Sequence, residues 1–140
     1  MLSIIGKIKN RMGSEQGFTL IELLVVIVIL GVLVAIAVPS YLSFRGKAQT
    51  AAAEANVRTA IPAAESYYQT NGYSYAGLAL ATLQTEAPGI AGTVTAGPNA
   101  SADGYCLQDT QGTDTWSYAG GVGGAGKIVN NACAAGYTLG

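Results

Sequence analysis

The feature that most constrains this chain is an apolar run close to the first residue. Between Phe18 and Phe44 the only charged side chain is Glu22, and residues 23–38 contain no polar side chain. In a helix with a rise of about 1.5 Å per residue, about 20 apolar residues cross the roughly 30 Å of bilayer hydrocarbon. A core helix of a soluble domain would carry polar residues at every third or fourth position. The run therefore predicts a membrane-spanning helix.

The residues before the run predict its orientation. This flank is basic, because it contains three basic residues and one acidic residue: Lys7, Lys9, Arg11 and Glu15. Basic flanks stay in the cytoplasm, which predicts a single-pass chain with its N-terminus inside and its C-terminus outside. A secretory signal carries its small-residue cleavage site after the apolar region, whereas here a small residue, Gly17, precedes it.

Cleavage after Gly17 would create a positive charge that Glu22 can neutralise. Phe18 would become the new N-terminus, and its α-amine, with an ordinary pKa of about 7.7 to 8, would be mostly protonated. Glu22 lies four residues further on the same helix face. It could neutralise the amine of its own chain or that of a neighbouring subunit. Alternatively, Glu22 simply reaches the headgroups and favours the helix N-terminus.

One continuous motif runs from Gly17 to Tyr41 and reads GFTLIELLVVIVILGVLVAIAVPSY. It resembles the class III signal and N-terminal helix of type IV pilins and of the related pseudopilins of type II secretion. The resemblance implies cleavage by a prepilin peptidase between Gly17 and Phe18, followed by N-methylation of Phe18. It also places Glu22 at the position of the assembly glutamate of that family.

Gly31 and Pro39 are the expected weak points of the helix. Pro39 removes an amide donor and clashes with the preceding turn, and Gly31 lowers helix propensity by roughly 1 kcal/mol relative to Ala. The resemblance implies that the segment between these two positions can melt in assembled filaments. Both residue types are also common in membrane helices that stay intact.

After the apolar run, residues 45–69 predict an amphipathic helix, with Glu54 and Arg58 as an i,i+4 ion pair on its polar face. Asn71 and Gly72 are expected to end it. The apolar stripe, expected to pack on a sheet, consists of Ala53, Val57, Ile61, Ala64 and Tyr68.

The remaining residues predict a small β-rich head. Short β-prone runs occur at residues 92–96, 105–108 and 115–118, which favours an antiparallel sheet of three or four strands. The expected fold is α+β, with the long N-terminal helix packed on this sheet. Four segments follow: a leader (1–17), an apolar assembly helix (18–44), an amphipathic helix (45–71) and a β-sheet head (72–140).

Cys106 and Cys133 are the only cysteines. The predicted topology places both outside the cytoplasm, where disulfides persist, so an even count favours a bridge. Two free or separately buried thiols are the alternative. The resemblance implies the bridge, since many type IV pilins carry a C-terminal disulfide loop with an exposed surface.

Enzymatic and cofactor chemistry find little support in the sequence. The chain has no histidine, which excludes His-based triads, and two cysteines cannot form a structural zinc site. Residues 121–127 satisfy a G-x-G-x-x-G pattern, but too few residues follow for a dinucleotide site, so we expect a hairpin loop inside the disulfide loop. We expect no enzyme activity, no cofactor and no metal site. The alternative of calcium ligation in turn-like sequence would use Asp103, Asp109 and Asp114.

The resulting hypothesis is a structural subunit that forms a helical homo-oligomer. Without its leader the chain has more acidic than basic side chains, so the monomer is not expected to bind nucleic acid directly. The resemblance implies a prepilin peptidase/methyltransferase, an assembly platform and a motor ATPase as partners. The chain would lie in the inner or cytoplasmic membrane before assembly and in an extracellular pilus afterwards. The alternatives are a secretion or competence pseudopilin, and an unprocessed single-span protein with a ligand-binding ectodomain.

Overall fold

The computed structural model describes residues 17–140, so of the expected leader only Gly17 lies within the described part. The chain divides into two compact units, the first ending at Tyr41 and the second running from Leu42 to Gly140. Helix α2 (Leu20–Thr70) contributes residues to both units. The second unit adds the short helix α3 (Leu80–Glu86) and a four-stranded sheet. The expected α+β fold is confirmed.

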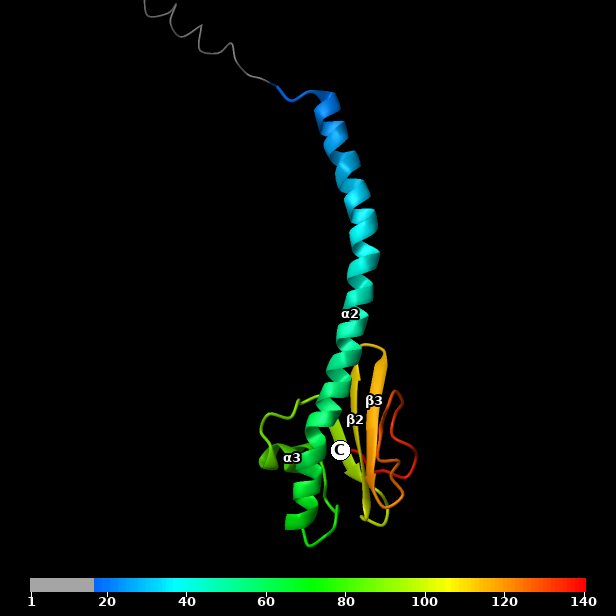
Figure 1. The fold of residues 1–140 in the computed structure, drawn as a ribbon. Coiled ribbons are helices and arrows are strands. Elements are labelled where there is room, and N and C mark those ends of the chain that lie inside the picture. Colours follow the sequence, from blue (N-terminus) through cyan, green and yellow to red (C-terminus); the bar gives the residue numbers. More distant parts are fainter. Residues whose placement is uncertain (1–16) are drawn as a thin grey trace, which may run out of the picture. The chain divides into compact units, whose positions relative to one another are not determined.

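The sheet is an antiparallel meander in the order β1-β2-β3-β4. Its central hairpin turns at Gly112, whose φ of 63° lies in the left-handed region that suits glycine. Figure 1 shows β2 and β3 side by side, with α2 next to β2, and α3 lies against β1. The strands are β1 (Val94–Pro98), β2 (Gly104–Gln111), β3 (Asp114–Gly121) and β4 (Ile128–Val129).

Alternation along β2 assigns the two faces of the sheet. Tyr105 and Leu107 are fully buried in the core that α2 shares with the sheet. Cys106 lies between them in the sequence and therefore points to the opposite face. The inner face packs on α2, and the outer face carries the disulfide.

The buried residues of α2 differ in part from the expected apolar stripe. Ala53, Val57 and Ala64 are buried as expected, but Ile61 and Tyr68 are only partly buried. Two alanines not included in the expected stripe, Ala60 and Ala63, are buried in their place. Small side chains of α2 therefore lie inside the core cluster, while the bulkier Ile61 and Tyr68 pack against it from its border.

Helix α2 ends where the sequence predicts. Gly72 has a φ of 64°, and the N–H of Tyr73 donates to the carbonyl of Tyr68 at 2.9 Å. The rings of Tyr73 and Tyr68 meet edge to face with centroids 5.6 Å apart. This is a Schellman-type helix end, in which a glycine in the left-handed region is followed by an apolar contact back to the last turn.

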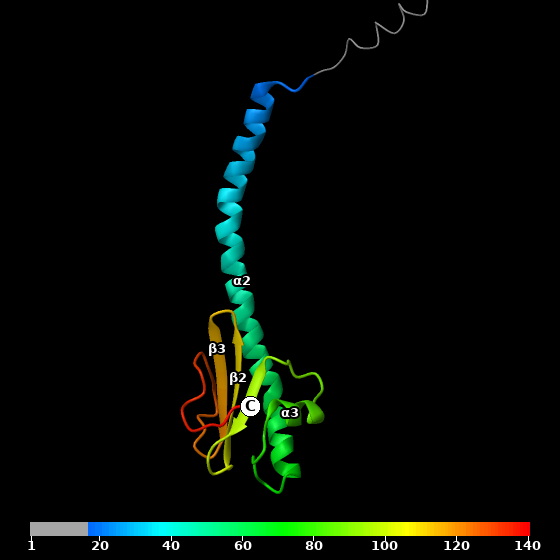
Figure 2. The ribbon, with the colours of Figure 1, turned by 180° about the vertical axis from the view of Figure 1, so that it is seen from behind.

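The last four residues cover the free edge of β1. Thr138 and Gly140 donate their N–H groups to the carbonyls of Pro98 and Ala96, at 2.9 and 3.1 Å. Both views show the C-terminus beside the strands (Figures 1 and 2). The chain end therefore protects a strand edge that could otherwise pair with another molecule.

Candidate functional site

The apolar segment, residues 18–44, is exposed throughout. Every large apolar side chain from Phe18 to Phe44 has between 47% and 83% of its surface accessible. Helix α2 is long and apolar enough to cross a membrane by length and composition, and its most apolar window is not buried at all, unlike the core helix of a soluble protein. Such a surface needs lipid or another protein to cover it.

Thr19 fixes the first turn of α2, and the sequence prediction overlooked it. Its hydroxyl accepts the N–H of Glu22 at 3.2 Å, and its carbonyl accepts the N–H of Leu23 at 3.3 Å. A threonine followed three residues later by a glutamate is the capping-box pattern, so the signal was present in the sequence. Glu22 is therefore held in the first turn, where the helix dipole favours a negative charge.

Gly31 and Pro39 both lie within α2 in the exposed segment. A Cβ added to Gly31 would meet nothing within 4 Å, so no packing contact within the described chain requires a glycine there. Their role as weak points of the helix stays a prediction.

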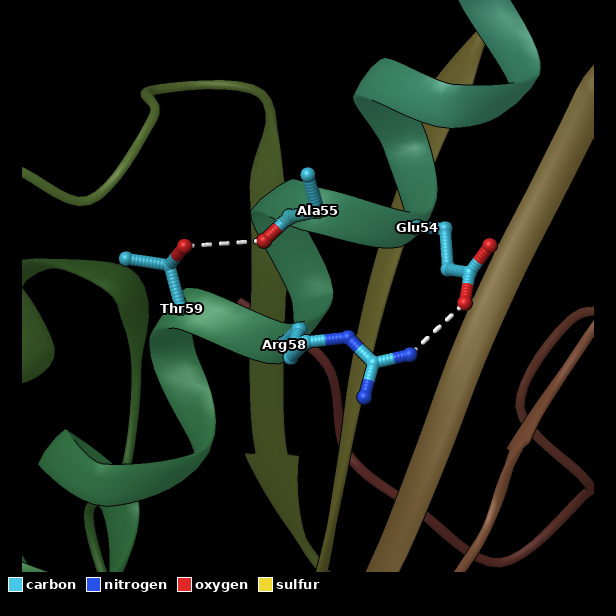
Figure 3. Close-up of polar contacts among 4 residues, drawn as sticks. All are labelled: Glu54, Ala55, Arg58 and Thr59. Carbon is cyan, nitrogen blue, oxygen red and sulfur yellow. Dashed lines mark hydrogen bonds and ion pairs between the residues drawn. The ribbon is translucent and has the colours of Figure 1, made fainter.

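Just beyond the apolar segment, charged and polar side chains join the alanines on the exposed sides of α2. The expected ion pair is confirmed: Arg58 donates to Glu54 at 2.7 Å (Figure 3). In the same view the hydroxyl of Thr59 donates to the carbonyl of Ala55 at 2.8 Å, and this pair points away from the ion pair. Thr59 thus presents its methyl group to the surroundings with its hydroxyl already bonded within the helix.

The structure contains the Cys106–Cys133 disulfide on the outer face of the sheet. The N–H of Cys133 also donates to the Oε1 atom of Gln108 at 2.8 Å. Both bonds tie the segment after β4 to the centre of β2. They hold the chain in position before it reaches the edge of β1.

A carboxylate on α2 joins the helix to two tyrosines of the head. Glu65 accepts hydrogen bonds from the phenols of Tyr105, at 2.7 Å, and Tyr75, at 3.1 Å. Burial, and then this hydrogen bond, raise the pKa of the Tyr105 phenol well above its usual range. Burial and the nearby Glu65 charge raise the pKa of Tyr75 in the same direction. Both phenols therefore act as donors: Tyr105 links α2 to β2, and Tyr75 links α2 to the loop before α3.

The three aspartates considered for calcium lie apart and have different partners. Asp103 is in the turn before β2, and its carboxylate accepts a hydrogen bond from Asn99. Asp114 begins β3 and accepts one from Thr50. The turn prediction was wrong for Asp109, which lies in β2, is 1% exposed and accepts from Asn56 at 2.8 Å. No group of three potential metal-ligating acidic, cysteine or histidine side chains occurs within residues 17–140.

The glycine-rich motif at residues 121–127 forms the connection between β3 and β4. These strands are antiparallel neighbours, so the predicted hairpin loop is confirmed. A phosphate-binding loop leads into a helix whose N-terminus meets the phosphate, whereas a strand follows here.

The fold and the exposed segment define a class of protein: a small α+β head whose long helix begins with an exposed apolar segment. A family model described as the prokaryotic N-terminal methylation motif matches residues 12–38. The type IV wide pilus major component PilA4 of Thermus thermophilus is 34% identical over 97 residues, which cover 69% of this chain and 73% of that protein. The chain belongs to the type IV pilin family.

Other relatives match a shorter part of the chain. The type IV major pilin protein PilA of Myxococcus xanthus is 38% identical over 54 residues, 39% of this chain and 24% of that protein. The type II secretion system core protein G of Pseudomonas aeruginosa is 41% identical over 62 residues, 44% of this chain and 43% of that protein. The chain thus spans less than half the length of these two relatives. No solved structure matches it.

Proposed function

We propose that this chain is the precursor of a structural pilus subunit. A prepilin peptidase cleaves it between Gly17 and Phe18 and methylates the new N-terminal amine, and the product assembles into a helical surface filament that serves adhesion, motility or DNA uptake. The observation that carries the proposal is the fully exposed apolar segment at the start of α2. Its match to the N-terminal methylation motif supports the same conclusion.

The membrane holds the chain before assembly. Residues 1–17 stay on the cytoplasmic side, the apolar segment spans the bilayer, and the head lies outside, where a disulfide persists. An assembly platform and a motor ATPase then extract the subunit into the filament. Lateral packing of Leu, Val, Ile and Ala side chains replaces lipid around each segment. In this proposal the chain acts as a structural building block.

Glu22 sets the register between subunits in this proposal. A protonated Phe18 amine in an apolar core requires an anion, and Glu22 of the next subunit supplies it. Each subunit uses one surface towards the next copy and another towards the previous copy. Heterologous contacts that do not close a ring produce a helical filament.

A second candidate is a pseudopilin that forms a short, envelope-spanning fibre for secretion or competence. The similarity to a type II secretion core protein supports this second candidate. The two candidates share processing and Glu22, and they differ in whether filaments reach the cell surface.

The test is Glu22→Ala, compared with Glu54→Ala, which removes the same charge from an exposed site on α2. We expect Glu22→Ala chains to be cleaved normally but absent from filaments sheared off the cells. Glu54→Ala should assemble, because a surface ion pair contributes at most about 1 kcal/mol. Normal filaments of Glu22→Ala chains would contradict the register role.

A further inference from the structure

One exposed face of α2 in the second unit carries opposite charges at its two ends. We call it the outer face and define it by the exposed residues Arg45, Ala48, Ala52, Ala55 and Thr59 and by the half-buried Ser66 at its end. At about 100° per residue these side chains fall within an arc of about 80°, on the side of the helix away from the buried Val57. The bonded hydroxyl of Thr59 leaves the middle of this face without an unsatisfied polar group.

Arg45 provides the positive end of the outer face. It is exposed, and the one ion pair among the described residues joins Arg58 to Glu54, so Arg45 has no acidic partner there. Glu86 provides the negative end, since its exposed carboxylate borders α2 by accepting a hydrogen bond from Ser66 at 3.1 Å.

The two ends cannot meet within one subunit. Arg45 and Ser66 are 21 residues apart in one helix, a distance of about 31 Å along the axis. A second copy in the same orientation, displaced by that length, would place its Arg45 beside Glu86 of the first. The contact would repeat without closing, as a filament requires.

We propose that the outer face is an interface with a second copy of this chain, in which Arg45 of one subunit pairs with Glu86 of another. Charge complementarity along the face identifies the occupant. The face also begins directly after Phe44, where the apolar segment ends in the sequence. The inference rests on the proposed function and adds a specific contact to it.

Charge reversal tests the pair. Arg45→Glu and Glu86→Arg should each lower the yield of sheared filaments at least about tenfold, because like charges then face each other at every repeat. The double variant Arg45→Glu with Glu86→Arg should restore the yield. Matched controls are Lys47→Glu, about 200° around the helix from Arg45, and Asp103→Arg, in the turn before β2. Both controls should assemble.

A cross-link provides the independent readout. The double variant Arg45→Cys with Glu86→Cys should form a ladder of disulfide-linked chains in filaments on a non-reducing gel, and neither single variant should. The separation within one subunit excludes an intramolecular link.

Failure of the double reversal to restore filaments, or the absence of a ladder, would overturn the pair while wild-type filaments still support the proposed function. If the processed chain is lost from the membrane both in Arg45→Glu and in the double variant, Arg45 contacts the lipid surface instead. That result would also overturn the proposed pair. Absence of the wild-type chain from sheared filaments would refute both proposals.

Discussion

Removing the disulfide should destabilise the head by a predictable amount. Cys106 and Cys133 are 27 positions apart, and the loop that they close restricts the unfolded chain. The loop-closure entropy is about 12 cal/mol/K, which corresponds to about 3.6 kcal/mol at 25 °C. For a unit the size of residues 42–140, such a loss lowers the Tm by about 15–30 °C.

The assay uses the processed full chain in detergent. Trp116 is the only tryptophan and lies partly buried on β3, so its fluorescence reports unfolding of the head alone. The double variant Cys106→Ala with Cys133→Ala should unfold at the lower temperature. Reductant should destabilise the wild type to the same level and leave the variant unchanged. A loss below about 1 kcal/mol would refute the loop-closure argument.

Two further perturbations probe the head. Gly97→Ala would place a Cβ 1.8 Å from the carbonyl oxygen of Thr138. We therefore expect the free energy of unfolding to fall by about 1–3 kcal/mol and carboxypeptidase to trim the C-terminus faster. Gly92→Ala is the control, because open space surrounds that position, and it should behave as wild type. Equal trimming of the two variants would contradict this. Burial and the Glu65 hydrogen bond raise the pKa of Tyr105 above the ordinary value of about 10, so the free energy of unfolding should fall as the pH rises above about 10. Tyr105→Phe should reduce this decrease in the free energy of unfolding. An unchanged pH dependence would contradict the role of Tyr105.

The first half of the molecule was the more predictable part. A run with one charge in 27 residues leaves few options besides a membrane-spanning or assembly helix. The end of α2 was also readable, because Gly72 takes the left-handed conformation that glycine favours. The cap at Thr19 was also readable, because a threonine three residues before a glutamate is a local capping pattern, although the sequence prediction did not include it.

The head was predicted in outline only. Helix α3 has seven residues, too few for a periodic pattern, and β4 has two. The burial of Ala60 and Ala63 depends on which side chains from the rest of the head cover α2, and no local pattern encodes that. Asp109 resembles a turn residue in sequence, and hydrogen bonds from Asn56 on α2 and from Gln111 make its buried position tolerable.

The most direct test of the proposed function is the intact mass of this chain in filaments sheared from cells. The account predicts a species that begins at Phe18, carries one added methyl group and is two hydrogens lighter than the reduced chain. An unprocessed chain in the envelope would contradict cleavage after Gly17. A processed chain confined to the envelope would contradict the surface filament and favour the pseudopilin.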